Sequence, residues 1–198
     1  MKKLDTDGLI TRLRFQKDEW PKTAFKKLHQ AFPKLLALDA HCCRHLHIAN
    51  FTSDLCPLLE SFEYHWASSA GCAESDILQF LTGRNILKRL DMRMLQNVSD
   101  VLLNKLPNHC PELEELVLDG KLNGITSKGL FDLVAALPRL RILVLQQPSY
   151  IGNMPHIAPF PQRAGLEIVC AIESHHQQDN FLCGSASLRK SIINPGIR

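Results

Sequence analysis

The sequence predicts an α/β fold: a right-handed β/α solenoid, or horseshoe, with parallel strands on the concave face and helices on the convex face. The first observation is a set of seven apolar clusters whose starts are separated by 25, 24, 28, 26, 27 and 26 residues. These starts are Ile10, Leu35, Leu59, Leu87, Leu113, Leu140 and Leu166. A constant interval of roughly 20–30 residues is typical of solenoids built from stacked units. We therefore expect about seven repeats.

The second observation is the apolar pattern within each cluster. Apolar residues stand three and five positions after the start, most clearly at Leu116 and Leu118 after Leu113. Because successive side chains of a strand point to opposite faces, these two positions are expected in the core. Positions two, four and six after each start are then expected on the concave face.

The third observation is the helix-like sequence between the clusters. Apolar residues at helical spacing follow Pro21, which suits the first turn of a helix. They also follow Ser99 and Thr126, which can cap the free N–H groups of a helix. A further helix is predicted over 77–81. Prolines at 33, 107 and 138 are expected to end their helices. A single helical turn is predicted near 51–55, and an irregular loop over 147–165. Strand–helix–strand connections of this kind give parallel strands with right-handed crossovers.

The composition is that of one soluble globular domain. The chain has 198 residues, of which 45% are hydrophobic and 22% charged, and its net charge is +3. The repeats are expected to fill residues 1–174, whereas 175–198 continue no repeat and are expected to form a disordered tail or a partial cap. The small charge argues against nucleic acid as a partner, since such proteins usually carry a strong basic stripe.

The sequence also predicts where the protein is located. No apolar run is long enough to span a bilayer, and the amino terminus becomes acidic where a signal peptide would be hydrophobic. The seven cysteines are then expected to be reduced, several of them buried. A cytoplasmic or nuclear protein, without membrane attachment, is the expectation.

Two stretches carry a family resemblance. Cys110-Pro-Glu-Leu-Glu-Glu-Leu-Val-Leu118 and Ile125-Thr-Ser-Lys-Gly-Leu130 resemble the strand and helix halves of a cysteine-containing leucine-rich repeat, and Cys56-Pro-Leu-Leu59 repeats the first half. Such repeats are similar to the ribonuclease-inhibitor horseshoe and occur above all in F-box proteins, where they select substrates for a cullin-based ubiquitin ligase. The similarity extends over about residues 9–173 and is specific over 97–146. No F-box is present, so the resemblance concerns only the repeats.

The resemblance implies a protein-binding function without cofactors. A protein substrate or partner is expected on the concave face, and a cullin-ligase adaptor would bind only through an F-box outside this chain. The alternative is a scaffold or inhibitor that works without an F-box. The candidate binding residues are Arg12, Arg14, Asp39, Glu63, Arg89, Asp91, Arg93, Glu115, Asp119, Ile142 and Val144. The last unit should add Ile168, Cys170 and Ile172, over which the proline-rich loop or the tail could also fold.

Catalytic and metal chemistry have little support in the sequence. Residues 41–47, which contain His41, Cys42, Cys43, His45 and His47, are a remote candidate for zinc. Zinc ligands usually come in two spaced pairs, and this cluster has no second half. No phosphate-binding loop, nucleophile elbow or metalloprotease motif is present. We therefore expect neither an enzyme nor a metal protein.

Overall fold

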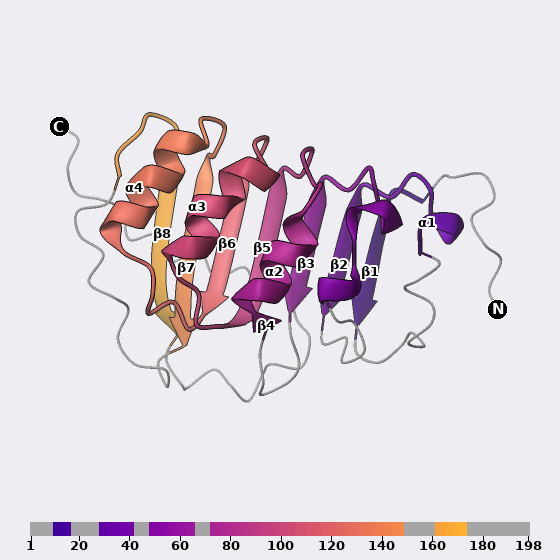
Figure 1. The fold of residues 1–198 in the computed structure, drawn as a ribbon, viewed down its shortest axis with the longest axis horizontal. Helices are drawn as coiled ribbons and strands as arrows, with labels where there is room; N and C mark the ends of the chain where they lie inside the picture. The colour runs from indigo at the N-terminus through magenta and orange to yellow at the C-terminus, as the bar shows by residue number, and fades with distance from the viewer. Residues whose placement is uncertain (1–9, 17–27, 42–47, 66–71, 149–160, 174–198) are drawn as a thin grey trace.

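The fold was obtained as a computed structural model (Figure 1), which describes residues 10–16, 28–41, 48–65, 72–148 and 161–173. Its centre is a parallel sheet of eight strands. Seven strands follow one another in chain order across the sheet: β1 (Arg12–Gln16), β2 (Ala37–His41), β3 (Ser61–His65), β5 (Arg89–Gln96), β6 (Glu115–Gly120), β7 (Ile142–Pro148) and β8 (Glu167–Glu173). The eighth, β4 (Cys72–Ala73), pairs with the end of β5 and was not expected from the sequence.

The helices lie over one face of this sheet (Figure 1). They are α1 (Leu28–Ala31), α2 (Glu74–Leu81), α3 (Asp100–His109) and α4 (Ser127–Ala136). Two 3-10 turns, η2 (Ile48–Asn50) and η3 (Ser53–Leu55), connect β2 to β3, close to the predicted helical turn. The mixed α/β class and the parallel strands are thus confirmed.

The helix starts agree with the sequence. Ser99 caps α3 by accepting a hydrogen bond from the backbone N–H of Val101 at 3.2 Å, and Thr126 caps α4 by accepting one from Gly129 at 3.1 Å. Both caps satisfy backbone donors that have no partner within the helix.

One helix end was predicted wrongly. Pro107 was expected to stop α3 at Leu106, yet α3 continues to His109 and contains the proline. A proline inside a helix removes one backbone donor. The last turn is closed regardless, because the N–H of Cys110 donates to the carbonyl of Leu106 at 2.8 Å. Pro33 and Pro138, by contrast, follow the ends of α1 and α4 as expected.

The core lies between the sheet and the helices. The position three residues after each start forms one in-register row across the sheet, and from β2 to β7 its members are at most 1% exposed. This row is Leu38, Phe62, Leu90, Leu116 and Leu143. The predicted division between core and opposite face is therefore confirmed from β2 to β7. Burial of one such leucine stabilises the fold by about 1.5–3 kcal/mol.

The last strand has a different register from the one predicted. Ile168 and Cys170 were expected on the face away from the core, but they pair with Leu143 and Leu145 and pack against the core. Glu167 pairs directly with Ile142, so the strand repeats after 25 residues rather than 26. The turn residue Leu140 lies two residues before Ile142, whereas Leu166 lies only one residue before Glu167. Because apolar residues alternate into both faces of β8, the sequence pattern does not reveal this shift of one residue. Ile172 lies in β8, at a position whose burial is not described.

No helix in the described residues is both long enough and apolar enough to cross a lipid bilayer.

Candidate functional site

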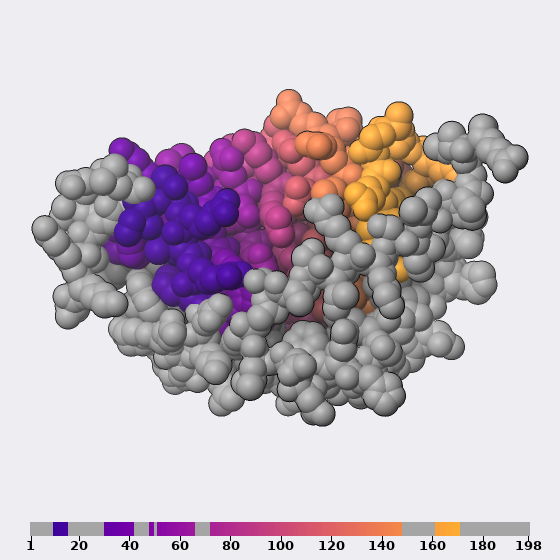
Figure 2. Space-filling view, turned by 180° about the vertical axis from the view of Figure 1, so that it is seen from behind, coloured from indigo at the N-terminus to yellow at the C-terminus, as the bar shows by residue number. Residues whose placement is uncertain are grey.

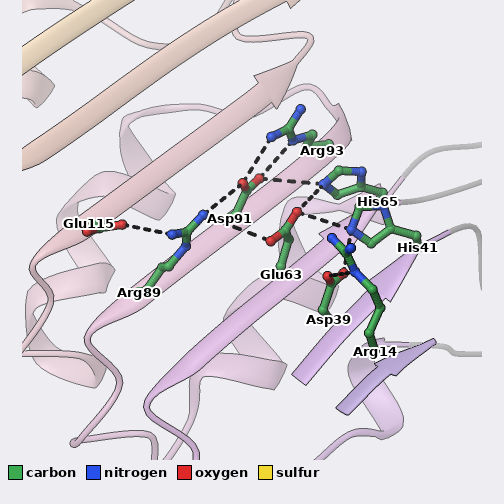
Figure 3. Close-up of polar contacts among 9 residues, drawn as sticks. All are labelled: Arg14, Asp39, His41, Glu63, His65, Arg89, Asp91, Arg93 and Glu115. Carbon is green, nitrogen blue, oxygen red and sulfur yellow. Dashed lines mark hydrogen bonds and ion pairs between the residues drawn. The ribbon is translucent and has the colours of Figure 1, made fainter. Parts of the chain in front are cut away.

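The sheet face turned away from α2, α3 and α4 carries a dense group of charged side chains, which we call the ionic face. Figure 2 views the molecule from this side, and Figure 3 shows the group in detail. Its members are Arg14, Asp39, His41, Glu63, His65, Arg89, Asp91, Arg93 and Glu115. They come from β1, β2, β3, β5 and β6, so residues far apart in the sequence meet here.

The register of the strands sets the order of charges. Asp39, Glu63 and Asp91 are direct neighbours in one row across β2, β3 and β5, with Arg14 at the end of the row. Neighbouring strands lie roughly 4.8 Å apart, so three adjacent carboxylates would repel one another without compensation. The compensating positive charges come from both sides of this row.

Arginine side chains neutralise the outer carboxylates. Arg93 binds Asp91 with two hydrogen bonds, of 3.0 and 3.2 Å, and Arg14 pairs with Asp39. Arg89 lies 4.0 Å from both Glu63 and Asp91, and its Nη1 is 3.2 Å from Glu115. A bidentate pair such as that of Arg93 fixes the carboxylate in one orientation.

The central carboxylate, Glu63, is held by two histidines. Its Oε1 lies 3.1 Å from Nε2 of His41 and 3.2 Å from Nε2 of His65. The two imidazole rings are 3.8 Å apart between centroids and inclined by 39°. His41 also contacts Asp39, and Nε2 of His65 is 4.0 Å from Asp91. We call His41, Glu63 and His65 the His–Glu–His cluster.

The electrostatics divide the two histidines. Burial alone would lower the pKa of His41, but hydrogen bonds to Asp39 and Glu63 outweigh it and raise that pKa to about 9. For His65 burial prevails, assisted by the charges of Arg93 and His41, and lowers its pKa despite the Glu63 carboxylate. Hydrogen bonds from both histidines hold the pKa of Glu63 well below its usual range. Near neutral pH the cluster therefore contains a carboxylate, an imidazolium and a neutral imidazole.

The donor atoms of this cluster are also those of a metal site. One ring nitrogen of each histidine and a carboxylate oxygen of Glu63 all lie within 4.8 Å of one another. Within the described residues, no other set of three or more histidine, cysteine or acidic side chains brings its donor atoms this close together. Two imidazoles and a carboxylate suit a divalent transition metal.

The structure places the predicted binding residues unequally. Arg12, Arg14 and Arg89 are exposed on the ionic face, and Glu63, Arg93 and Glu115 are half-buried there. Asp91 and Asp119, however, are only 1% and 6% exposed. Asp91 holds Arg93 in place, so its expected role of contacting a partner directly does not fit this burial.

The apolar end of the face has a different composition from that predicted. Ile142 and Val144 are half-buried on it, next to Val117 of β6. The register of β8 adds Val169 beside Val144, in place of the predicted Ile168 and Cys170. The apolar end therefore consists of Val117, Ile142, Val144 and Val169.

Sequence reasoning missed the His–Glu–His cluster. Of the predicted cluster at 41–47, only His41 belongs to the described residues, and Cys42, Cys43, His45 and His47 lie outside them. The positions two, four and six after each start had put Glu63, His65 and His41 on one face, and the register confirms that His41 is directly opposite His65. What the sequence did not indicate is that both imidazoles turn toward the Glu63 carboxylate. A search for ligands close together in the sequence could not find this set.

The comparisons with known proteins give no family for this chain. No protein-family model matches it, and a search of curated proteins finds no significant match.

Proposed function

We propose that this chain is a leucine-rich-repeat interaction module whose ionic face binds a partner protein. Its closest functional analogy is the substrate-recognition region of an F-box-type subunit of a cullin-based ubiquitin ligase. The module performs no covalent chemistry of its own. The arrangement of charged and apolar side chains on such a surface determines which partner protein it binds.

A repeated turn supports the seven-repeat solenoid in this proposal. The first apolar residue of a cluster donates its N–H to the carbonyl three residues earlier in six successive units. These donors are Leu35, Leu59, Leu87, Leu113, Leu140 and Leu166. Six of the predicted starts thus occupy the same position of the same turn. A repeated local structure at a constant interval is what defines stacked units.

Contacts between successive helices also support stacked units. Glu74, the first residue of α2, accepts hydrogen bonds from the N–H and the hydroxyl of Ser99, at 2.8 and 3.0 Å. Asp100, the first residue of α3, accepts the equivalent pair from Thr126 at 2.8 and 2.6 Å. Each acidic side chain therefore fixes the N-terminus of the next helix, so a unit depends on its neighbour.

The observation that carries the binding proposal is the change of character along the ionic face. One row across the sheet reads Arg14, Asp39, Glu63, Asp91, Val117, Val144 and Val169. It is charged from β1 to β5 and apolar from β6 to β8. An apolar end can contribute affinity to a bound protein, while the charged end can set its orientation.

The partner is a protein rather than nucleic acid or a membrane, because the face carries both signs of charge in similar numbers. A cytoplasmic or nuclear location suits this proposal. A cullin-ligase adaptor would join only through an F-box outside this chain. A scaffold or inhibitor without an F-box uses the same face, and capture of the adaptor by this chain distinguishes the two.

The test is affinity capture followed by mass spectrometry, with two charge-reversed variants. Arg14→Glu with Arg89→Glu changes exposed residues of the ionic face, and Lys105→Glu with Lys128→Glu makes the same change on α3 and α4. Proteins captured by the wild type should be lost with the first variant and retained with the second. The second variant should keep nearly the wild-type melting temperature, since exposed ion pairs contribute only about 0–1 kcal/mol each. The first loses positive charge beside Asp39, Glu63 and Glu115 and should melt at a lower temperature, so capture is compared where circular dichroism shows both variants folded.

Equal capture by both variants would contradict binding at the ionic face. Unfolding of the Arg14→Glu and Arg89→Glu variant would instead assign these arginines a structural role.

A further inference from the structure

We propose that the His–Glu–His cluster binds one divalent transition-metal ion, Zn²⁺ first among them, through Nε2 of His41, a carboxylate oxygen of Glu63 and Nε2 of His65. This site lies on the ionic face, but metal binding needs only side chains of β2 and β3 and does not depend on the proposed partner. Three protein ligands leave a further coordination position for water or for a group of a bound molecule.

The spacing of the donor atoms fits such an ion. Zinc lies about 2.0–2.1 Å from histidine nitrogen and from carboxylate oxygen, so ligand atoms at tetrahedral angles are about 3.3–3.4 Å apart. The carboxylate oxygen of Glu63 is 3.1 Å from one imidazole nitrogen and 3.2 Å from the other. Small side-chain movements, together with release of the proton that His41 carries near neutral pH, would therefore bring all three donors to metal–ligand distance.

The backbone holds the ligands in place. His41 and His65 are directly opposite each other in the register of β2 and β3, and Glu63 is two residues before His65 on the same face. A site on strands of a sheet is more precisely positioned than one on loops. Only 11%, 21% and 20% of the side-chain surfaces of His41, Glu63 and His65 are exposed, so the donors are partly shielded from water.

In the described part of the chain, one donor atom of the cluster is poorly satisfied by its contact with Glu63. Nε2 of His65 is buried and makes no aligned hydrogen bond there, although it is directed toward the carboxylate of Glu63. A buried polar atom without a hydrogen bond is costly, and metal coordination would remove this cost.

The surroundings can accommodate an added positive charge. Asp39 contacts His41, and Asp91 lies 4.0 Å from Nε2 of His65. Once His41 has released its proton to the solvent, the ionic face holds four carboxylates, Asp39, Glu63, Asp91 and Glu115, against the three guanidinium groups of Arg14, Arg89 and Arg93. Arg14 and Arg93 bind Asp39 and Asp91 and so fix the carboxylates that surround the ligands, which is the usual role of an outer shell.

The experiment measures metal binding by the full chain without an affinity tag, after treatment with a chelator. Titration with Zn²⁺, followed by calorimetry, should show one ion bound per chain. Co²⁺ should also bind, and its absorption bands in the visible range should be those of a cobalt ion with a low coordination number. Because no thiolate belongs to this ligand set, no sulfur-to-cobalt charge-transfer band should appear in the near ultraviolet.

Matched variants test the ligands. Glu63→Gln and His65→Gln should each weaken Zn²⁺ binding at least about tenfold, since loss even of an outer-shell partner typically costs 10–100-fold. Glu115→Gln, on the same face but outside the cluster, should bind as the wild type does. So should Cys42→Ser with Cys43→Ser, which separates this site from the neighbouring cysteines.

The proposal fails if the wild type binds no Zn²⁺, or if Co²⁺ gives a thiolate band. It also fails if Glu63→Gln and His65→Gln both retain wild-type affinity. Far-ultraviolet circular dichroism of the metal-free variants separates loss of a ligand from loss of the fold. Because the measurement involves no partner protein, its failure would leave the proposed docking function untouched.

Discussion

Thr126 donates two hydrogen bonds to Asp100, from its backbone N–H at 2.8 Å and from its hydroxyl at 2.6 Å. Thr126 is the N-cap of α4 and Asp100 is the first residue of α3. One carboxylate thus connects the starts of two neighbouring helices. Negative charge is also favourable near helix N-termini, so the same group stabilises both helices electrostatically.

Removing this carboxylate should destabilise the fold. We expect Asp100→Ala to lower the free energy of unfolding by about 1–2 kcal/mol, because α4 loses both hydrogen bonds at its cap. Asp132→Ala is the matched control, since Asp132 pairs with the exposed Lys128 in α4 and should change stability by less than about 0.5 kcal/mol when replaced. Urea denaturation followed by circular dichroism measures both. Equal effects of the two substitutions would contradict the role of Asp100.

Gly129 of α4 is packed against the same carboxylate. A Cβ atom at this position would lie within 3 Å of three atoms of the Asp100 side chain. Gly129→Ala should therefore destabilise the protein, although alanine is favoured over glycine in a helix by about 1 kcal/mol. With Asp100 already replaced by alanine, Gly129→Ala should instead be neutral or stabilising. A double-mutant cycle measures this change of sign. Strict additivity would show that the two residues do not interact.

Arg84 is a buried cation whose partners are carbonyl groups and aromatic rings. Its side chain donates to the carbonyls of Phe51, Thr52, Cys56 and Phe80 and lies over two aromatic rings. It is only 3% exposed, and burial lowers its pKa to about 10.

Replacing Arg84 should be among the most damaging single changes. Arg84→Met leaves several buried carbonyls without a donor, and we expect a loss of about 3 kcal/mol. Arg84→Lys should recover little of this, because an ammonium group cannot reproduce the planar set of donors. Arg141→Met, at an exposed position, should be nearly neutral. Melting temperatures compare the three, and full stability of Arg84→Lys would disprove the requirement for a guanidinium group.

The buried cysteines should be unreactive in the native protein. Burial raises the pKa of Cys56, Cys72 and Cys110 to about 12. At pH 8 only about one of these thiols in ten thousand is then ionised, and the thiolate is the reactive form.

A short exposure to iodoacetamide at pH 8 should therefore leave these three cysteines unmodified, while the same treatment in urea should modify all of them. Peptide mapping by mass spectrometry assigns the label to each position. Between pH 8 and 10 the ionised fraction of each buried thiol should rise about a hundredfold, so its slow labelling should keep increasing with pH after that of an exposed thiol has levelled off. Rapid native modification of any of the three would contradict the core packing.

Much of the fold was predictable because its signals are local. The alternation that buries Leu116 and Leu118 belongs to a single strand, and the caps Ser99 and Thr126 accept hydrogen bonds from N–H groups no more than three residues away. The end of α3 was not predictable in this way. Pro107 is tolerated there because the hydrogen bond from Cys110 to Leu106 still closes the helix.

The candidate site was predicted only as a set of positions. The sequence assigned Asp39, Glu63 and Asp91 to one face. It did not indicate that Asp91 would be almost fully buried and in contact with Arg93. It also put His41 and His65 at position six of neighbouring units, as the register confirms, but gave no sign that both imidazoles would converge on Glu63. These features depend on rotamers and on contacts between strands, which one strand's pattern does not contain.

The sequence by itself determined the interval, the parallel strands and the division of β2 to β7 into core and opposite face, because these follow from side-chain alternation and from turns closed over three residues. Only the tertiary structure decided the register of β8, the burial of Arg84 and the convergence of His41, Glu63 and His65. The hydrogen bonds of Arg84 to Phe51 and of His41 to Glu63 span 33 and 22 residues. Contacts of that kind form only when whole units stack, so their partners are set by packing between units and not by the sequence around each residue.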